Sequence, residues 1–87
     1  MHEPAHKKRI TDNLSRAIGH LTSVKKMVED DRDCTDVLIQ IAAVRSAITS
    51  IGKAILQQHL THCIAEAVET GDRTSMDDLN DAVQKLL

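Results

Sequence analysis

The middle of the sequence carries a long apolar repeat that constrains the fold more than any other feature. Apolar residues recur there in steps of four and three, which is the heptad spacing of one helix face. They are Val37, Ile41, Val44, Ile48, Ile51 and Ile55. Further apolar residues on neighbouring faces mean that this helix needs more than one packing partner. A chain of 87 residues offers few internal partners, so we expect other subunits to supply them.

A helix is also predicted on each side of this segment. The first has the same heptad spacing, with Pro4 in its first turn. Its apolar residues are Ile10, Leu14, Ala17, Leu21, Val24 and Val28. The last helix is short, and its apolar face consists of Met76, Leu79, Val83 and Leu86. We therefore expect one all-α domain over residues 1–87, with a long middle helix, assembled as an antiparallel helical-bundle dimer and a dimer of dimers.

Polar and glycine residues predict where these helices begin and end. Asp33, with Asp36 three residues later, is close to a capping box for the middle helix. No turn signal surrounds Gly52, so the middle helix is expected to run through it and to end at Gly71. Thr74 with Asp77 resembles a cap for the last helix.

Composition narrows the classes of function. The chain has no Phe, Trp or Tyr, which excludes base stacking on aromatic rings. Three Gly and one Pro are too few for an all-β chain built of tight turns. No glycine-rich phosphate loop or nucleophile–base pair is recognisable, so we predict that the protein is not an enzyme. No apolar run approaches about 20 residues and no signal peptide is visible, so we expect a cytoplasmic protein with no membrane partner.

Cys34, His59 and Cys63 carry the most specific chemistry. His59 and Cys63 lie four residues apart, so both are on one face of a helix and can bind one ion together. Cys34 begins the same predicted helix, roughly 37 Å from His59 along a straight axis. One helix cannot bring these three side chains together, but two antiparallel copies can.

A symmetric antiparallel pair of helices fixes where its two-fold axis lies. Placing Cys34 opposite the midpoint of His59 and Cys63 puts the axis near Ala47 and Ile48, at the centre of the most apolar stretch. Each dimer then has two equal sites, with Cys34 from one subunit and His59 and Cys63 from the other. Two thiolates and one imidazole suit a trigonal Cu(I) site, and a fourth ligand would open it to Ni(II), Zn(II) or Co(II).

Four segments of the sequence resemble the CsoR/RcnR family of bacterial metal-sensing repressors. They are LSRAIGH (14–20), VKKMVEDDRDC (24–34), DVLIQIAAVRSA (36–47) and HLTHC (59–63). The spacing of Cys, His and Cys is that of the copper-type members. The resemblance implies an all-helical dimer or tetramer that binds operator DNA when metal-free. It also implies that Cu(I) binding releases the operator and derepresses metal efflux or resistance genes.

The same resemblance implies two further site residues. Nickel-type relatives take a ligand from an N-terminal His 32 residues before the Cys, which is the position of His2, so a four-ligand Ni(II) site is the alternative. A carboxylate that accepts a hydrogen bond from the ligand His corresponds to Asp78 if one gap is allowed, and to Leu79 without the gap. Asp33 stands where copper-type members have a Tyr.

Basic residues are concentrated in the first third of the chain, although the net charge is −2. Lysine and arginine contacts to phosphates supply most of the affinity of DNA-binding surfaces. Given the resemblance, the set expected to face operator DNA is Lys7, Lys8, Arg9, Arg16 and Arg45. In the family pattern, Asn13 replaces an arginine and His20 replaces a glutamine.

Two other functions remain open at this point. A thiol or persulfide sensor of the same fold would bridge Cys34 to Cys63 of the facing subunit, but relatives of that kind lack the histidine that is present here as His59. A metal-storage or chaperone protein would bind no DNA, and the basic first third argues against it. We treat the remaining histidines as surface residues, namely His6, His20 and His62.

Overall fold

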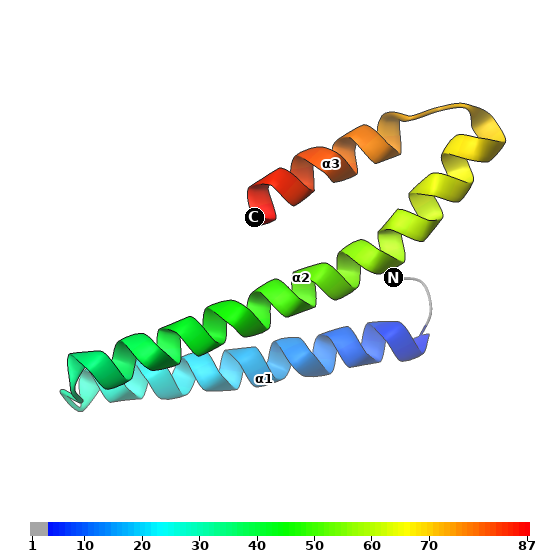
Figure 1. Ribbon diagram of the computed structural model, residues 1–87. Coiled ribbons are helices and arrows are strands. Elements are labelled where there is room, and N and C mark those ends of the chain that lie inside the picture. The colour runs from blue at the N-terminus through cyan, green and yellow to red at the C-terminus, as the bar shows by residue number, and fades with distance from the viewer. Residues whose placement is uncertain (1–3) are drawn as a thin grey trace.

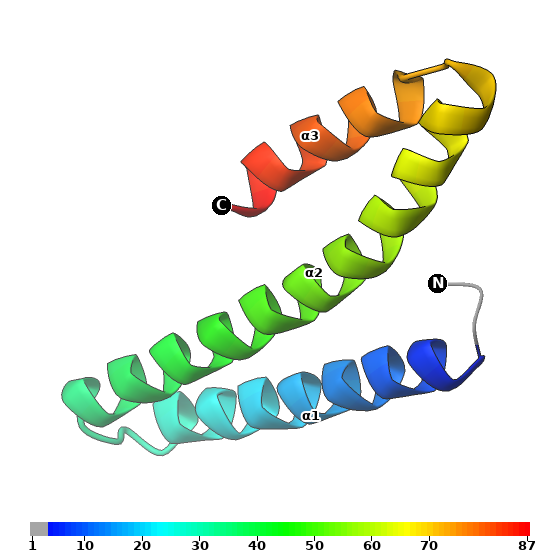
Figure 2. The ribbon, with the colours of Figure 1, turned by 45° about the vertical axis from the view of Figure 1, so that its right-hand side comes forward.

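The computed structural model describes residues 4–87 and folds them into three helices, with no strand in this range. The helices are α1 (Pro4–Glu29), α2 (Cys34–Thr70) and α3 (Thr74–Leu86). α1 lies antiparallel along the first part of α2, and α3 folds back along its second part (Figure 1). Figure 2 shows the same arrangement from a second side, with α2 between the other two helices. The predicted order, with a long middle helix, is confirmed.

The contact between α1 and α2 is a narrow apolar strip. Ile10 and Ala17 of α1 pack with Ile51 of α2, bordered by Ala54 and Ile55. All of these residues except Ala54 belong to the predicted heptad faces, and Val24 and Val44 are buried in the same way towards the other end. The subunit is only 13 Å across in its thinnest direction, so it has one layer of helices and no enclosed core.

Much of the apolar surface of α2 is open in a single subunit. Leu38, Ile41 and Ile48 are 61%, 42% and 47% exposed. α2 also contains an 18-residue window with a mean hydropathy of 1.3, of which 11% is buried. By length and composition alone α2 would therefore pass as a membrane-spanning helix, contrary to the expectation from the sequence. A single helix of this kind is weak evidence for a membrane, because a helix that packs between subunits has the same composition.

The boundaries of α2 lie where the sequence predicted them, but the predicted side-chain capping hydrogen bonds are not formed. α2 runs through Gly52 and ends at Gly71, which has a φ of 73° as helix-ending glycines often do. Asp33 is the N-cap residue of α2, as predicted, and its backbone carbonyl accepts a hydrogen bond from the N–H of Val37 at 3.1 Å. Its side chain makes no hydrogen bond to the helix, so the predicted side-chain capping is wrong.

The cap expected at the start of α3 is also wrong. Thr74 is the first residue of that helix rather than its cap. The carboxylate of Asp72 instead accepts hydrogen bonds from the hydroxyl and backbone N–H of Thr74, at 2.7 and 2.9 Å. These two bonds hold the pKa of Asp72 below its ordinary value. Asp72 lies in the short connection between α2 and α3, so the spacing of residues within α3 could not predict this cap.

Candidate metal site and nucleic-acid interface

The predicted metal ligands lie at opposite ends of α2. Cys34 is its first residue and is exposed. His59 is half-buried, and Cys63, one turn later, is buried. Within residues 4–87, no three His, Cys, Asp or Glu side chains are grouped closely enough to hold a metal ion. One subunit therefore does not bring the predicted ligands together by itself.

One open side of α2 connects these two ends. Cys34, Ile41, Ile48 and His59 follow one another in steps of seven or eleven residues, which return to nearly the same side of an α-helix. Ile41 and Ile48 are exposed between the two ends. A second copy laid antiparallel on this side would cover the isoleucines and bring its Cys34 to the His59–Cys63 pair.

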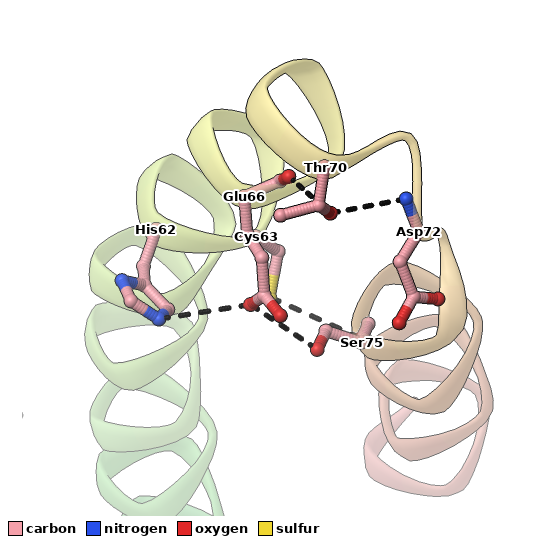
Figure 3. Close-up of polar contacts among 6 residues, drawn as sticks. All are labelled: His62, Cys63, Glu66, Thr70, Asp72 and Ser75. Atoms are coloured by element: carbon pink, nitrogen blue, oxygen red, sulfur yellow. Dashed lines mark hydrogen bonds and ion pairs between the residues drawn. The ribbon is translucent and has the colours of Figure 1, made fainter.

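The surroundings of Cys63 were not foreseen from the sequence. Its thiol donates a hydrogen bond to the backbone carbonyl of Ser75, with Sγ and O 3.9 Å apart. The Ser75 hydroxyl donates to Oε2 of Glu66 at 3.4 Å. His62 Nε2 lies 3.9 Å from the same carboxylate oxygen (Figure 3). The first turn of α3 therefore packs directly on the ligand-bearing end of α2.

Asp78 does not contact His59 in the subunit. α3 faces α2 with Met76, Leu79 and Val83, which line a cavity together with side chains of α2. Asp78 is exposed, and no hydrogen bond or ion pair joins it to His59 within the described part of the chain. Its role as a hydrogen-bond acceptor for the ligand histidine therefore stays a prediction. His2, the candidate fourth ligand, lies outside the described residues.

All three histidines assigned to the surface have partners in the structure, and two of them, His6 and His20, are at least half-buried. The prediction for His6 is wrong: its side chain is buried, because it lies one turn before Ile10 and so continues the α1 face that packs on α2. The Arg9 guanidinium donates to Nδ1 of His6 at 3.2 Å, and Nε2 is buried without a partner. His20 is half-buried and forms a 2.7 Å hydrogen bond with Gln40 that joins α1 to α2.

The basic residues of α1 do not all share one side of the helix. Arg9 and Arg16 are seven residues apart and therefore point in similar directions. Arg16 donates to the side-chain oxygen of Asn13 at 2.9 Å. Lys8 instead forms a 2.8 Å ion pair with Asp12, and this hydrogen bond holds the pKa of Asp12 below its ordinary value. Asp12 therefore stays charged and offsets Lys8. Lys7 is exposed.

A second basic stripe lies on α2. Arg45, Thr49 and Lys53 follow one another in steps of four and line a shallow polar groove with Ser46 and Ser50. Lys53 was missed in the sequence because it lies between the segments that carry the family resemblance (36–47 and 59–63), whereas Arg45 lies within one of them. Its position two turns after Arg45 is the signal that would have found it.

Known proteins of one kind match this chain over most of its length. A family model described as a metal-sensitive transcriptional repressor matches residues 6–85. The copper-sensing transcriptional repressor CsoR of Bacillus subtilis is 38% identical over 80 residues, which covers 91% of this chain and 79% of that protein. The copper-sensing transcriptional repressor RicR of Mycobacterium tuberculosis is 43% identical over 58 residues, covering 67% of this chain and 60% of that protein.

Two solved structures agree with this assignment. The copper-sensing repressor CsoR with Cu(I) from Geobacillus thermodenitrificans is 34% identical, with a TM-score of 0.88 over 98% of this chain and 90% of that one. The nickel-responsive transcriptional regulator InrS is 37% identical, with a TM-score of 0.79 over 92% of this chain and 91% of that one. The match of sequence and of helix arrangement shows that this chain belongs to the family of metal-sensitive transcriptional repressors.

Proposed function

We propose that the protein is a Cu(I)-responsive transcriptional repressor that acts in the cytoplasm as a homo-oligomer. One observation carries the proposal: an exposed apolar side of α2 has a thiol at one end and an imidazole–thiol pair at the other. An antiparallel dimer covers the apolar side and completes two metal sites in the same step. Relatives named as copper sensors support the choice of metal.

Each site would consist of Cys34 from one subunit with His59 and Cys63 of the partner subunit. Two soft sulfur ligands and one imidazole suit Cu(I), which accepts three ligands in a trigonal arrangement. The residues fit the ion, because His59 and Cys63 are one turn apart on α2 and can bind together. The bound ion would add a link between subunits that the metal-free dimer does not have.

The DNA-facing surface would be formed by the arginines of α1 and the basic stripe of α2. Arg9 and Arg16 point in similar directions, and Arg45 and Lys53 lie on an exposed side of α2. Such a surface contacts phosphates without a helix-turn-helix or aromatic stacking. In an oligomer the patch is repeated by symmetry, so residues 1–87 would serve as one domain for sensing and for DNA binding.

Ni(II) is the second candidate metal. The similarity to InrS, named as a nickel-responsive regulator, and the 32-residue spacing from His2 to Cys34 favour it. A His–Cys–His–Cys set would give the four-coordinate, tetragonal geometry that Ni(II) accepts. A thiol or persulfide sensor is less well supported, because Cys63 is buried and His59 is present.

The deciding experiment is a competition titration of the reduced protein with Cu(I) and Ni(II), followed by absorption and by loss of operator binding. Cu(I) is expected to bind at one ion per subunit and to release the DNA. Tight Cu(I) binding that leaves DNA affinity unchanged would contradict the regulatory role. Release by Ni(II) alone would replace the copper assignment with the nickel one.

A substitution of His2 distinguishes a three-ligand Cu(I) site from a four-ligand Ni(II) site. His2→Ala should leave Cu(I) affinity nearly unchanged, because three other ligands complete the copper site. If Ni(II) is the physiological ion, the same change removes one of four ligands and reduces the nickel response sharply. A full transcriptional response to nickel in the His2→Ala protein would reject the four-ligand site.

A further inference from the structure

The sulfur of Cys63 lies beneath the first turn of α3 (Figure 3). Only 5% of this residue is exposed, although it belongs to the proposed metal site. Its Sγ makes a long hydrogen bond, 3.9 Å, to the carbonyl of Ser75. Cys34 is exposed, so the two candidate thiol ligands differ in access within one subunit.

Glu66 ties this first turn of α3 to α2. It follows Cys63 by three residues, and its Oε2 accepts the hydroxyl hydrogen bond of Ser75 at 3.4 Å. His62 Nε2 lies 3.9 Å from the same oxygen. Ser75 therefore contacts α2 twice, through its hydroxyl at Glu66 and through its carbonyl at Cys63.

The connection between α2 and α3 keeps this turn in place. The backbone N–H of Asp72 donates to Oγ1 of Thr70 at 3.1 Å, and the Asp72 carboxylate caps Thr74. These bonds fix the start of α3 next to the end of α2.

We propose that Glu66 is a positioning residue of the metal site, which acts through the Ser75 hydroxyl to hold the first turn of α3 over the Cys63 sulfur. The inference rests on the proposed function, since it assigns a role to the cover over a metal ligand. A metal binds this sulfur as the thiolate, so the thiol proton is released to solvent and the hydrogen bond from Sγ to the Ser75 carbonyl is lost. Metal uptake then moves α3, which gives metal-free and metal-bound subunits different contacts, as any coupling to DNA requires.

The test measures how fast each cysteine of the reduced, metal-free protein is alkylated by iodoacetamide, read by mass spectrometry. Cys63 should react at least about tenfold more slowly than it does in the urea-unfolded protein, because in the folded protein it reacts only when its cover opens. Glu66→Ala and Ser75→Ala each remove one hydrogen bond of the cover. Each should speed Cys63 roughly three- to tenfold and leave Cys34 unchanged.

Two further variants separate positioning from general loss of structure. Glu66→Gln keeps an acceptor oxygen for Ser75, so Cys63 should stay slow. Glu69→Ala removes the same charge from an exposed position of α2 and should also leave Cys63 slow. Circular dichroism checks that each variant is folded. If Glu66→Ala is unfolded, Ser75→Ala tests the same hydrogen bond in its place. A Cys63 rate in the folded, unaltered protein equal to its rate in urea would overturn the proposal, as would a Glu66→Ala rate no higher than that of Glu69→Ala.

Stopped-flow uptake of Cu(I) then tests the link to the metal. Uptake should be faster in Glu66→Ala than in Glu69→Ala by a similar factor, and an equal rate in the two variants would overturn the link. The alkylation assay contains no metal. A copper titration that fails therefore does not affect the conclusion about the cover over Cys63. An alkylation assay that fails does not affect the proposed set of metal ligands.

Discussion

Arg16 shows how the structure positions one of the side chains proposed to contact DNA phosphates. Its guanidinium is held by Asn13, three residues earlier on α1, and it borders the groove between α1 and α2. Lys8, in contrast, is paired with Asp12, whose carboxylate stays ionised beside it. Both residues carry a positive charge, but the Asp12 carboxylate offsets that of Lys8 more strongly than that of Arg16.

Replacing Arg16 should affect DNA binding and not metal binding. Arg16→Ala is expected to weaken operator binding and to lower the salt dependence of log K by about one per phosphate contact removed. Cu(I) affinity should stay the same, because the proposed ligands lie on α2. Lys8→Ala is the control and should change the slope less, since Asp12 already offsets its charge. An unchanged salt slope in Arg16→Ala would exclude it as a phosphate contact.

At the scale of single residues, the sequence predicted which side chains share one side of a helix better than it predicted what packs against them. Spacing alone places His59 and Cys63 on one side of α2, and the structure has them there. Spacing does not say that α3 covers Cys63, because that cover depends on how residues 71–73 turn the chain. The sequence predicted a surface position for His6 because the apolar repeat of α1 starts only at Ile10, one turn later. The structure shows that the packed face begins at His6.

At the scale of helices, two glycines of α2 have opposite structural roles. Gly71 adopts a φ of 73°, which L-residues with a side chain rarely adopt, and its N–H bonds the carbonyl of Ala67. Gly52 lies inside the helix, where a Cβ atom would come 2.8 Å from Cδ2 of Leu86. That atom is the far end of a flexible side chain that is 38% exposed, so it can turn away.

Alanine substitutions at these two glycines should therefore change the free energy of unfolding differently. Gly71→Ala is expected to destabilise the protein by about 1 kcal/mol, the cost of left-handed backbone for a residue with a Cβ atom. Gly52→Ala should be neutral or stabilising, because alanine favours a helix interior by up to about 1 kcal/mol over glycine. Urea unfolding at one fixed protein concentration measures both. A Gly52→Ala protein as unstable as Gly71→Ala would show that Leu86 cannot move.

The helices themselves were predictable because their apolar periodicity is long and regular. Gly52 was rightly kept inside α2 and Gly71 rightly placed at its end. The caps were not predictable, because Asp72 caps α3 from within a three-residue connection. Oligomer formation was inferred from the sequence and is supported by the apolar surface that one subunit leaves open, but it stays a prediction.

At the scale of the whole molecule, that open surface should be covered by further subunits. Leu38, Ile41 and Ile48 are each more than two-fifths exposed in one subunit, and such a patch is unusual on a monomeric soluble protein. Size-exclusion chromatography with light scattering at micromolar concentration should give a dimer or a tetramer in the absence of metal. A monomer would remove the basis for a shared metal site.

The most direct test of the shared site is to mix two variants that are each unable to bind Cu(I) tightly. Cys34→Ala keeps His59 and Cys63, whereas Cys63→Ala keeps Cys34. After joint unfolding and refolding, half of the dimers combine one subunit of each kind, and each of these has one complete site. The mixture should therefore recover about a quarter of the unaltered protein's tight Cu(I) capacity, while either variant alone recovers none. A mixture that binds no more Cu(I) than its two components would contradict a site built between subunits.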